Sequence, residues 1–361
     1  MRVLHIAIDT AMGGIESFLL NIYTRIDRNK INFDFIEYGD IKREFDYQYS
    51  DLGAEIYKIS DRKKHPFLSA KQLKNVIKNG GYSVVHIHKN SLSDISAIKI
   101  CQNLNVPAVI IHSHNSSRDN KIIVMLHKWN RFFIDMKNIH RFACSVKAAE
   151  WMYGSDKSAI IINNGIDTRR FEFNAKIRTA VRAQLNIQNN FVIGSTGRLT
   201  HQKNPFFAIE LIHKLRRIDK KYKLLWVGDG ILKDAIKEQI KKYHEEDGVI
   251  ITGAVANPES YYQAMDVFIM PSFYEGFPIA AIEAQDAGLP CILSENITSE
   301  AQLTKDVYWR NLDTMDNWIE IVCKIGEKEL YRKSNRMILM KQGFDINATV
   351  EFLEKFYLNY S

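Results

Sequence analysis

The feature that most constrains the fold of this chain is an alternation of short β-branched runs with amphipathic helical stretches. The pattern occurs twice along the sequence. Helical stretches such as 14–26 and 69–79 separate the predicted strands, an order of elements typical of parallel sheets with crossover helices. The chain is therefore predicted to be an α/β protein with two open sheets. The strands are predicted at 3–8, 33–37, 55–59, 84–87, 108–111, 141–144 and 160–162, and again at 191–194, 223–227, 249–251, 267–270 and 290–293.

Length and turn residues divide the chain between the two sheets. At 361 residues it exceeds the size at which a single hydrophobic core keeps growing. The Asn-Gly step within 163–167 is a turn signal at the changeover between the two series. We therefore predict an N-terminal Rossmann-like domain over 1–165 and a C-terminal one over 166–345. The last segment, 346–361, has helical spacing of apolar residues and is expected to pack back on the N-terminal domain.

Composition excludes several classes of protein. Hydrophobic residues make up 46% and charged residues 25%, which is ordinary for a globular chain and unlike a disordered or collagen-like one. The four cysteines lie far apart without a C-x-x-C motif, so neither a zinc cage nor a disulfide framework is indicated. No apolar run reaches the roughly 18 residues that span a bilayer, and the sequence opens directly into a strand without a leader. A cytoplasmic protein is expected.

The net charge of +7 is concentrated in the first half, where residues 1–167 hold 23 basic and 17 acidic side chains. This bias suits an anionic ligand or an anionic membrane surface, although a solvated lysine-rich face produces the same bias. Basic residues accompany aromatic ones at 62–78 and 126–133, which suits a lipid surface, while a core-facing helix explains such a stretch equally well. We expect peripheral membrane attachment and no nucleic-acid partner.

Strand-to-helix junctions carry the residues that suggest chemistry. In an open parallel sheet, ligands bind at the carboxyl ends of strands, where helix N-termini offer free N–H groups. The first junction, 9–16, contains Gly13-Gly14, which would let the backbone approach a ligand, although a tight turn also explains the pair. The second junction, 197–205, brings Arg198 and Lys203 toward one anion. A guanidinium fork and an ammonium point charge suit a diphosphate that gains charge as its bond to a sugar breaks.

The third junction, 271–284, contains two carboxylates. Glu275 stands in the predicted loop, and Glu283 follows about two turns into a helix predicted to begin near Pro278. Because carboxylates accept hydrogen bonds from paired hydroxyl groups, the two side chains could hold a hexose and a ribose at once.

With these motifs, the sequence resembles the retaining glycosyltransferases of family 4, whose fold is called GT-B. The resemblance covers nearly the whole chain and implies two Rossmann-like domains whose parallel sheets face each other across a cleft. It rests on an ordered set of motifs: Asn164-Gly165-Ile166-Asp167, Gly197-Arg198-Leu199 with Lys203-Asn204, Gly228-Asp229-Gly230, Glu275-x7-Glu283 and Ala287-Gly288-Leu289-Pro290.

The resemblance implies roles for the junction residues. Arg198 and Lys203 would bind the donor diphosphate and stabilise the leaving group, and Glu283 would hold the donor ribose. Glu275 would hold the donor sugar and its phosphate together with backbone N–H groups. The paired glycines, Gly13 and Gly14, would approach the diphosphate from the other domain. The N–H groups beside Glu275 belong to Gly276, Phe277 and Ile279.

The resemblance also places a histidine after a strand of the first domain, near the transferred sugar. His114 is the expected catalytic histidine, and His112 competes with it, because where the strand ends decides which imidazole reaches the ligand. His86 and His88 flank another strand end and are expected to line the cleft or belong to the core.

No metal ion and no cofactor is expected. Glycosyltransferases of the other common fold hold a divalent ion with an Asp-x-Asp tripeptide, which is absent from this sequence. Arg198, Lys203 and helix N-termini would neutralise the diphosphate instead. The resemblance implies front-side displacement, in which the leaving diphosphate helps to deprotonate the incoming hydroxyl and the protein supplies position and electrostatics. Glu275 and Glu283 are then sugar holders rather than an acid and a nucleophile.

Similarity to enzymes of exopolysaccharide and capsule assembly implies a UDP-sugar donor and a glycan or polyprenyl-diphosphate-linked oligosaccharide acceptor. Such an acceptor would place the protein at the inner face of the cell membrane.

Three alternative functions remain. A dinucleotide-dependent oxidoreductase would need a complete G-x-G-x-x-G motif, which neither glycine-rich turn provides. A nucleotide-sugar epimerase of similar shape and an inactive glycosyltransferase-like binding subunit would be separated by product analysis and transfer assays.

Overall fold

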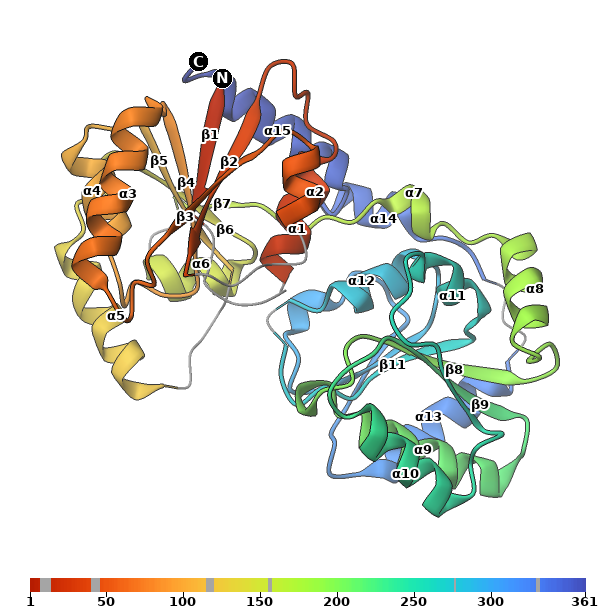
Figure 1. Ribbon diagram of the computed structural model, residues 1–361. Coiled ribbons are helices and arrows are strands. Elements are labelled where there is room, and N and C mark those ends of the chain that lie inside the picture. The colour runs from red at the N-terminus through yellow and green to blue at the C-terminus, as the bar shows by residue number, and fades with distance from the viewer. Residues whose placement is uncertain (7–13, 40–45, 115–119, 155–157, 276, 329–331) are drawn as a thin grey trace. The chain divides into compact units, whose positions relative to one another are not determined.

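The structure, a computed structural model, describes residues 1–6, 14–39, 46–114, 120–154, 158–275, 277–328 and 332–361. The chain forms two compact units (Figure 1). Unit 1 comprises Met1–Gly165 and Gly343–Ser361, and unit 2 comprises Ile166–Gln342. Each unit is built on one parallel sheet with helices on both faces, so the predicted α/β class with two Rossmann-like domains is confirmed.

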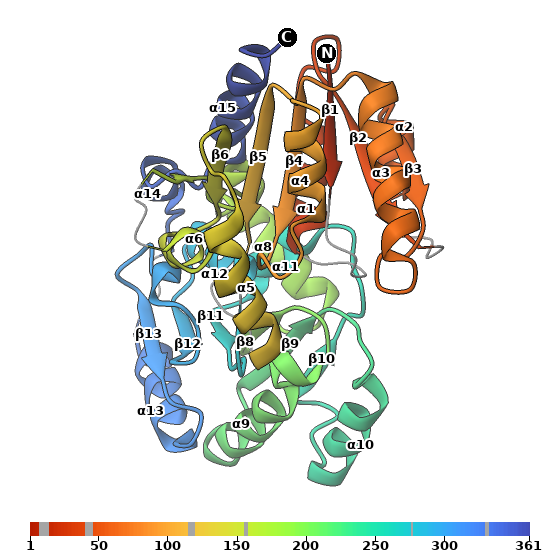
Figure 2. The ribbon, with the colours of Figure 1, turned by 90° about the vertical axis from the view of Figure 1, so that its left-hand side faces the viewer.

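Seven strands form the sheet of unit 1 in the order β3-β2-β1-β4-β5-β6-β7. All six strand pairs are parallel, and Figure 2 shows β2, β1, β4 and β5 as neighbouring arrows. The strand order reverses between β1 and β4, and such switch points are where open sheets bind ligands. The strands are β1 (Arg2–Ile6), β2 (Asn32–Tyr38), β3 (Glu55–Ile59), β4 (Val84–Lys89), β5 (Ala108–Ser113), β6 (Ile139–Ala143) and β7 (Ile160–Ile161).

Alternate side chains of these strands enter two different cores, as the period of two in a strand requires. One face packs against α3 (Pro66–Gly80), α4 (Ser96–Asn103) and α6 (Val146–Tyr153). The other face packs against α1 (Gly14–Tyr23) and α15 (Ile346–Leu358), which lie together on one side of the strands in Figure 1. Helix α15 buries Leu353 and Tyr357 in this second core, so the end of the chain completes unit 1. The remaining helices are α2 (Asp46–Asp51) and α5 (Lys121–Phe133).

Six parallel strands form the sheet of unit 2 in the order β10-β9-β8-β11-β12-β13. Helices α9, α10 and α13 pack one face of it, with Trp318 and Trp226 buried in that core. The strands are β8 (Phe191–Thr196), β9 (Tyr222–Val227), β10 (Val249–Ile251), β11 (Val267–Met270), β12 (Cys291–Ser294) and β13 (Val307–Arg310). The helices are α7 (Thr168–Phe171), α8 (Ala175–Gln184), α9 (Pro205–Ile218), α10 (Lys233–Tyr243), α11 (Pro258–Ala264), α12 (Ile279–Asp286), α13 (Met315–Gly326) and α14 (Arg336–Lys341).

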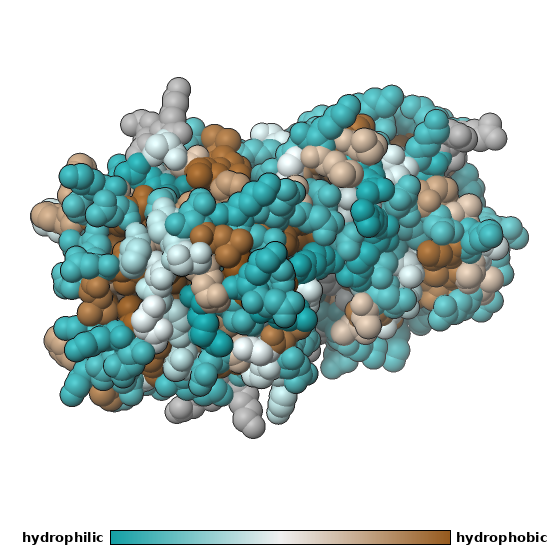
Figure 3. Space-filling view, turned by 90° about the horizontal axis from the view of Figure 1, so that it is seen from above, coloured by the Kyte–Doolittle hydropathy of each residue, from teal (hydrophilic) through white to brown (hydrophobic). Residues whose placement is uncertain are grey.

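One strand of unit 2 is not among the predicted ones. β13 pairs with β12 at the edge of the sheet. Only Val307 of its four residues is buried and the run ends in the polar Arg310, so no buried apolar run marks the strand in the sequence. Unit 2 also carries two short 3₁₀ turns, His201–Lys203 and Ser299–Ala301. On the face drawn in Figure 3, hydrophobic side chains are interspersed among hydrophilic ones, as is usual for a folded protein surface.

Candidate active site

Two of the predicted junctions lie side by side because β8 and β11 are neighbours in the sheet of unit 2. Both strands run in the same direction, so the loops at 197–204 and 271–278 leave the same edge of the sheet. The N–H of Phe273 donates to the carbonyl of Gln202 at 2.9 Å. The ring of Phe273 also stacks on His201, with 4.8 Å between ring centroids. Residues from two separate sequence motifs therefore meet at one edge.

Lys203 and Glu275 form an ion pair at this edge, with 2.7 Å between Nζ and Oε1. Only 19% of the Lys203 side chain and 6% of the Glu275 side chain is exposed. Gln202 Nε2 donates to the second carboxylate oxygen of Glu275 at 3.3 Å and to the carbonyl of Tyr274 at 3.0 Å. Partial burial strengthens such a pair relative to one at the exposed surface. Each side chain therefore holds the other in place.

Arg198 lies in the same loop as Lys203, and its side chain is exposed. Within the described part of the chain, no hydrogen bond or ion pair engages its guanidinium. Its loop is fixed through the backbone instead, because the N–H of Leu199 donates to the carbonyl of Asp229 at 2.9 Å. The guanidinium of Arg198 is thus available to an anion, whereas Lys203 is already paired with Glu275.

The glycines around this loop are explained by close approach of two backbones. A Cβ on Gly228 would lie 2.2 Å from the carbonyl oxygen of Gly197, and one on Gly230 would lie 2.5 Å from that of Leu199. Gly197 and Gly228 also have φ angles of +147° and +144°, which favour glycine. The Gly-Asp-Gly motif is therefore needed to pack the loop after β9 against the loop that carries Arg198.

Glu283 lies on α12 and accepts a hydrogen bond from the Tyr262 hydroxyl at 2.7 Å. Burial raises the pKa of Glu283 to about 7, although the hydrogen bond from Tyr262 acts in the opposite direction. Burial likewise raises the pKa of Tyr262 well above its ordinary value. Sequence reasoning missed Tyr262, because its approach to Glu283 depends on how α11 packs beside α12.

The backbone N–H groups at the N-terminus of α12 are expected to bind the donor, and one of them is already used within the protein. Gly276 lies outside the described residues, and Phe277 and Ile279 are partly buried. The N–H of Ile279, predicted to bind the donor, donates instead to the carbonyl of Phe277 at 3.0 Å. A ligand would have to displace that carbonyl to use this N–H.

Of the predicted glycine pair in unit 1, the structure describes only Gly14. Gly13 lies outside the described residues, and Gly14 is the first residue of α1. His114 directly follows β5, and its N–H donates to the carbonyl of Lys89 at 3.1 Å. His114 therefore lies at the carboxyl-end edge of β5, where a ligand is expected.

Histidines from β1, β4 and β5 gather on one face of this sheet. His5 lies opposite His86, and His88 lies opposite His112, so all of these side chains share the face covered by α1 and α15. Their ring nitrogens form two hydrogen-bonded chains. In the first chain, His88 lies 3.1 Å from His5 and 2.9 Å from His114. In the second, His86 lies 2.8 Å from the Tyr357 hydroxyl and 3.2 Å from His112.

Burial keeps these imidazoles neutral. It lowers the pKa of His5 and of His114 to about 3. Burial first, and then the neighbouring histidines, lower the pKa of His86, His88 and His112 well below the usual range. His112 is fully buried while His114 is partly exposed, which favours His114 over His112 as the residue that a ligand can reach.

The same histidines are the described residues that come closest to a metal-binding arrangement. Ligand atoms lie within 4.8 Å of one another in two groups, His5 with His86 and His88, and His88 with His112 and His114. Nitrogens at hydrogen-bonding distance from each other need a proton between them, however, and a metal would have to replace those protons. We therefore describe them as hydrogen-bonded chains and assign no metal.

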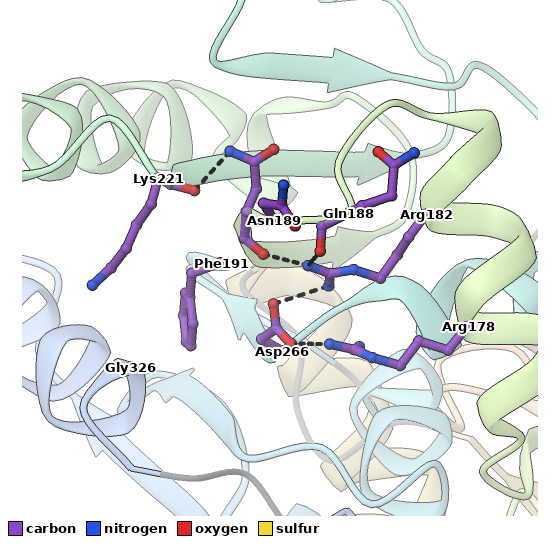
Figure 4. A pocket seen from close by; sticks show the side chains of 9 residues that line it. Arg178, Arg182, Gln188, Asn189, Phe191, Lys221, Asp266 and Gly326 are labelled. Carbon is purple, nitrogen blue, oxygen red and sulfur yellow. Dashed lines mark hydrogen bonds and ion pairs between the residues drawn. The ribbon is translucent and has the colours of Figure 1, made fainter.

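A second feature of unit 2 is a pocket of about 300 Å³ at the amino end of β8, the edge of the sheet opposite to the loops that carry Arg198 and Glu275. Figure 4 shows Asp266 between Arg178 and Arg182 in its wall. These guanidinium groups also donate to main-chain carbonyls, for example Arg182 Nη1 to that of Ala264 at 2.7 Å. Because their donors are used in this way, the pocket holds α8 against the sheet rather than presenting free cations to a ligand.

Comparison with known proteins decides what kind of domain carries this site. Residues 177–325 match the family model described as "Glycosyl transferases group 1". This segment is similar to glycosyltransferase group 1 domains. It contains Arg198, Lys203, Glu275 and Glu283, so the pair at the sheet edge lies within the matched region.

Relatives and solved structures extend the similarity over the whole chain. EpsF of Bacillus subtilis (strain 168), named as a glycosyltransferase, is 29% identical over 99% of this chain and 96% of its own length. The UDP-Gal:alpha-D-GlcNAc-diphosphoundecaprenol alpha-1,3-galactosyltransferase of Escherichia coli is 23% identical over 99% of this chain and 97% of its own. The crystal structure of Anabaena Alr3699/HepE in complex with UDP has a TM-score of 0.81 at 17% identity, covering 99% and 100% of the two chains. The same protein solved with UDP-glucose gives 0.77 at 16% identity. The fold is therefore GT-B, and the chain is similar over nearly its whole length to proteins named as glycosyltransferases.

Proposed function

We propose that this protein is a retaining glycosyltransferase of family 4 that transfers a sugar from a UDP-sugar to a glycan or polyprenyl-diphosphate-linked oligosaccharide in cell-surface polysaccharide synthesis. The observation that carries the proposal is the Lys203–Glu275 pair beside the free guanidinium of Arg198, at the carboxyl edge of the unit 2 sheet. This arrangement combines cations for a diphosphate with a carboxylate for sugar hydroxyl groups.

The donor is proposed to bind unit 2 in a fixed order. Arg198 and Lys203 bind the diphosphate, where charge develops as the bond to the sugar breaks. Glu275 accepts hydrogen bonds from the sugar, and Glu283, oriented by Tyr262, accepts them from the ribose. UDP as the carrier is supported by its presence in the HepE structure and in the donor named for the Escherichia coli relative. His114 of unit 1 is the proposed catalytic histidine.

Turnover is proposed to need no metal ion. The cations of Arg198 and Lys203 would neutralise a diphosphate bound at this sheet edge, and the sequence contains no Asp-x-Asp tripeptide. We propose that the leaving diphosphate helps to deprotonate the acceptor hydroxyl, since Glu275 is engaged with Lys203 and Glu283 with Tyr262.

The acceptor is proposed to be carried by a membrane lipid, as the name of the Escherichia coli relative indicates for that enzyme. No helix among the described residues is both long and apolar enough to cross a membrane. Helix α5 instead turns an apolar stripe outward at helical spacing, flanked by Lys121 and Lys128. A stripe of this kind beside basic residues suits the surface of an anionic bilayer. The stripe consists of Ile122, Met125, Leu126, Trp129, Phe132 and Phe133.

A ligand-stabilisation screen followed by product analysis tests the proposed function. UDP, GDP and ADP and a panel of their sugars are added in turn, and a specific binder raises the melting temperature by mass action. The proposal predicts stabilisation by UDP and by at least one UDP-sugar, then transfer to a lipid-linked acceptor with the anomeric configuration retained. An inverted product would refute retention. Conversion of the UDP-sugar without an acceptor would indicate an epimerase, and binding without turnover would indicate an inactive subunit.

A further inference from the structure

The five clustered histidines of unit 1 (His5, His86, His88, His112 and His114) have an arrangement that packing alone does not require. A neutral imidazole has one N–H donor and one acceptor nitrogen. His88 uses both ring nitrogens on other imidazoles, Nε2 toward His5 Nδ1 at 3.1 Å and Nδ1 toward His114 Nε2 at 2.9 Å. The tautomers of the three rings are therefore linked, because each hydrogen bond needs one donor and one acceptor.

This linkage allows only two arrangements of protons in the neutral chain. Either all three rings carry the hydrogen on Nδ1, or all three carry it on Nε2. In the first arrangement His5 donates to His88, His88 donates to His114, and His114 keeps a free Nδ1–H. In the second, the directions reverse and His5 keeps a free Nε2–H.

The surroundings of His5 favour the first arrangement. Its Nε2 is buried and has no hydrogen-bonding partner in the residues that the structure describes. The rings of Phe33 and Phe35 lie beside it, with centroids 4.1 and 5.5 Å from that of His5. Among backbone groups, buried N–H groups without an acceptor are rarer than acceptors left unfilled. Nδ1 of His114 is also buried without a partner, but His114 follows the end of β5 and is partly exposed, whereas His5 is fully buried. An acceptor can be supplied more readily at His114, so the unpaired hydrogen is favoured on His114 Nδ1 over His5 Nε2.

We propose that His88 is a positioning residue that, with His5, fixes His114 as the Nδ1–H tautomer, so that His114 offers a hydrogen-bond donor to an oxygen of the transferred sugar. Nδ1 of His114 is a buried atom without a partner among the described residues, and it is the ring nitrogen of His114 that no other imidazole uses. The inference deepens the role of His114 and rests on the proposed function for its consequence in turnover, but not for the tautomer itself.

The two ring nitrogens of His88 can be replaced one at a time. The amide of asparagine reaches about the position of Nδ1, and the amide of glutamine reaches about that of Nε2. His88→Asn should therefore keep the donor to His114, whereas His88→Gln should lose it. His86→Gln is the matched control, because His86 is equally buried on β4 but bonds to Tyr357 and His112 instead of His114.

Nitrogen-15 NMR of histidine-labelled protein reads the tautomer of His114 directly. The proposal predicts the Nδ1–H form in the parent, His88→Asn and His86→Gln, and a shift in His88→Gln toward the Nε2–H form that free histidine prefers. An Nε2–H His114 in the parent would overturn the proposal. So would an unchanged tautomer in His88→Gln, since His88 would then do no more than fill space.

The turnover rate of the variants is the second measurement. A positioned acid, base or donor contributes about 100- to 10,000-fold, so kcat of His88→Gln should fall by about 10- to 100-fold while His88→Asn stays within about threefold of the parent. UDP affinity should stay constant in all variants, because the proposed UDP contacts lie in unit 2. Equal losses in both His88 variants would contradict a specific role for Nδ1. A parent that binds no UDP and transfers no sugar would refute the proposed function and leave the NMR result to decide the tautomer.

Discussion

Acidification should destabilise unit 1 selectively, because its five clustered histidines are kept neutral by burial. The pKa of His5 and of His114 is lowered from 6.5 to about 3, and that of each other ring in the cluster is well below its usual value. Below pH 6.5 the unfolded chain therefore binds protons that the folded unit does not. Stability is complete above pH 6.5 and is lost progressively as the pH falls toward 3.

The size of the effect follows from the same values. Between pH 7.5 and pH 5.5, each histidine that titrates at 6.5 only when unfolded lowers the free energy of unfolding by about 1.4 kcal/mol. Five such groups give up to about 7 kcal/mol, comparable with the entire stability of many domains. Unit 1 should thus approach its unfolding threshold near pH 5.5.

Hydrogen–deuterium exchange at pH 7.5, 6.5 and 5.5, corrected for the intrinsic pH dependence of exchange, measures this loss unit by unit. Peptides from β4 and β5 should lose protection at pH 5.5, while peptides from β9 and β11 in unit 2 serve as the internal control. His5→Phe removes one titrating group and should reduce the difference between pH 7.5 and pH 5.5 by about 1.4 kcal/mol. Equal protection of β4 and β5 at all three pH values would refute the reasoning, since the histidines would then not be desolvated.

Three further predictions concern the proposed activity. Arg198→Ala should lower kcat by about 100- to 1,000-fold with UDP still bound, the usual loss when one preorganised partner of developing charge is removed, and unchanged kcat would exclude Arg198 from the leaving-group site. Transfer should continue in excess chelator, so activity abolished by chelator and restored by manganese would contradict metal-independent turnover. Trp129→Glu with Phe132→Glu should weaken binding to anionic vesicles by at least about tenfold, because burying each aromatic side chain contributes about 1.5–3 kcal/mol. The matched control is Ile231→Glu, a residue of unit 2 that is 89% exposed, and equal effects of the two changes would exclude α5 as the contact.

The sequence predicts best what depends on local pattern. Strands and glycine-rich turns are read from periodicity and turn chemistry, which is why the loops that carry Arg198 and Glu275 fall at strand ends as expected. The sequence predicts that the loops of Lys203 and Glu275 lie at the same edge of the sheet, but it does not predict that the two side chains pair. Their hydrogen bond depends on the order of β8 and β11.

What the sequence could not predict depends on register and on contacts far apart in the chain. His86 and His88 share a face by their spacing, but their meeting with His5 requires that β1 pairs with β4 in one register. Periodicity marks α5 as amphipathic but does not say that its apolar face points outward rather than into the core. Tyr262 lies twenty-one residues before Glu283 in sequence, and only the packing of unit 2 brings its hydroxyl to the carboxylate.

Calorimetry of UDP and a UDP-sugar on the parent and on Glu275→Gln tests the central claim that the Lys203–Glu275 pair forms the donor site. The substitution keeps the shape of the side chain but weakens its acceptor for sugar hydroxyl groups. A hydrogen bond to a charged group contributes about 1.5–3 kcal/mol, so UDP-sugar affinity should fall by about 10- to 100-fold while UDP binding survives. The control is Glu320→Gln, which breaks an exposed ion pair with Lys324 on α13 and should leave both affinities unchanged. If Glu275→Gln binds UDP and UDP-sugar like the parent and transfers sugar at the parental rate, this pair is not the donor site.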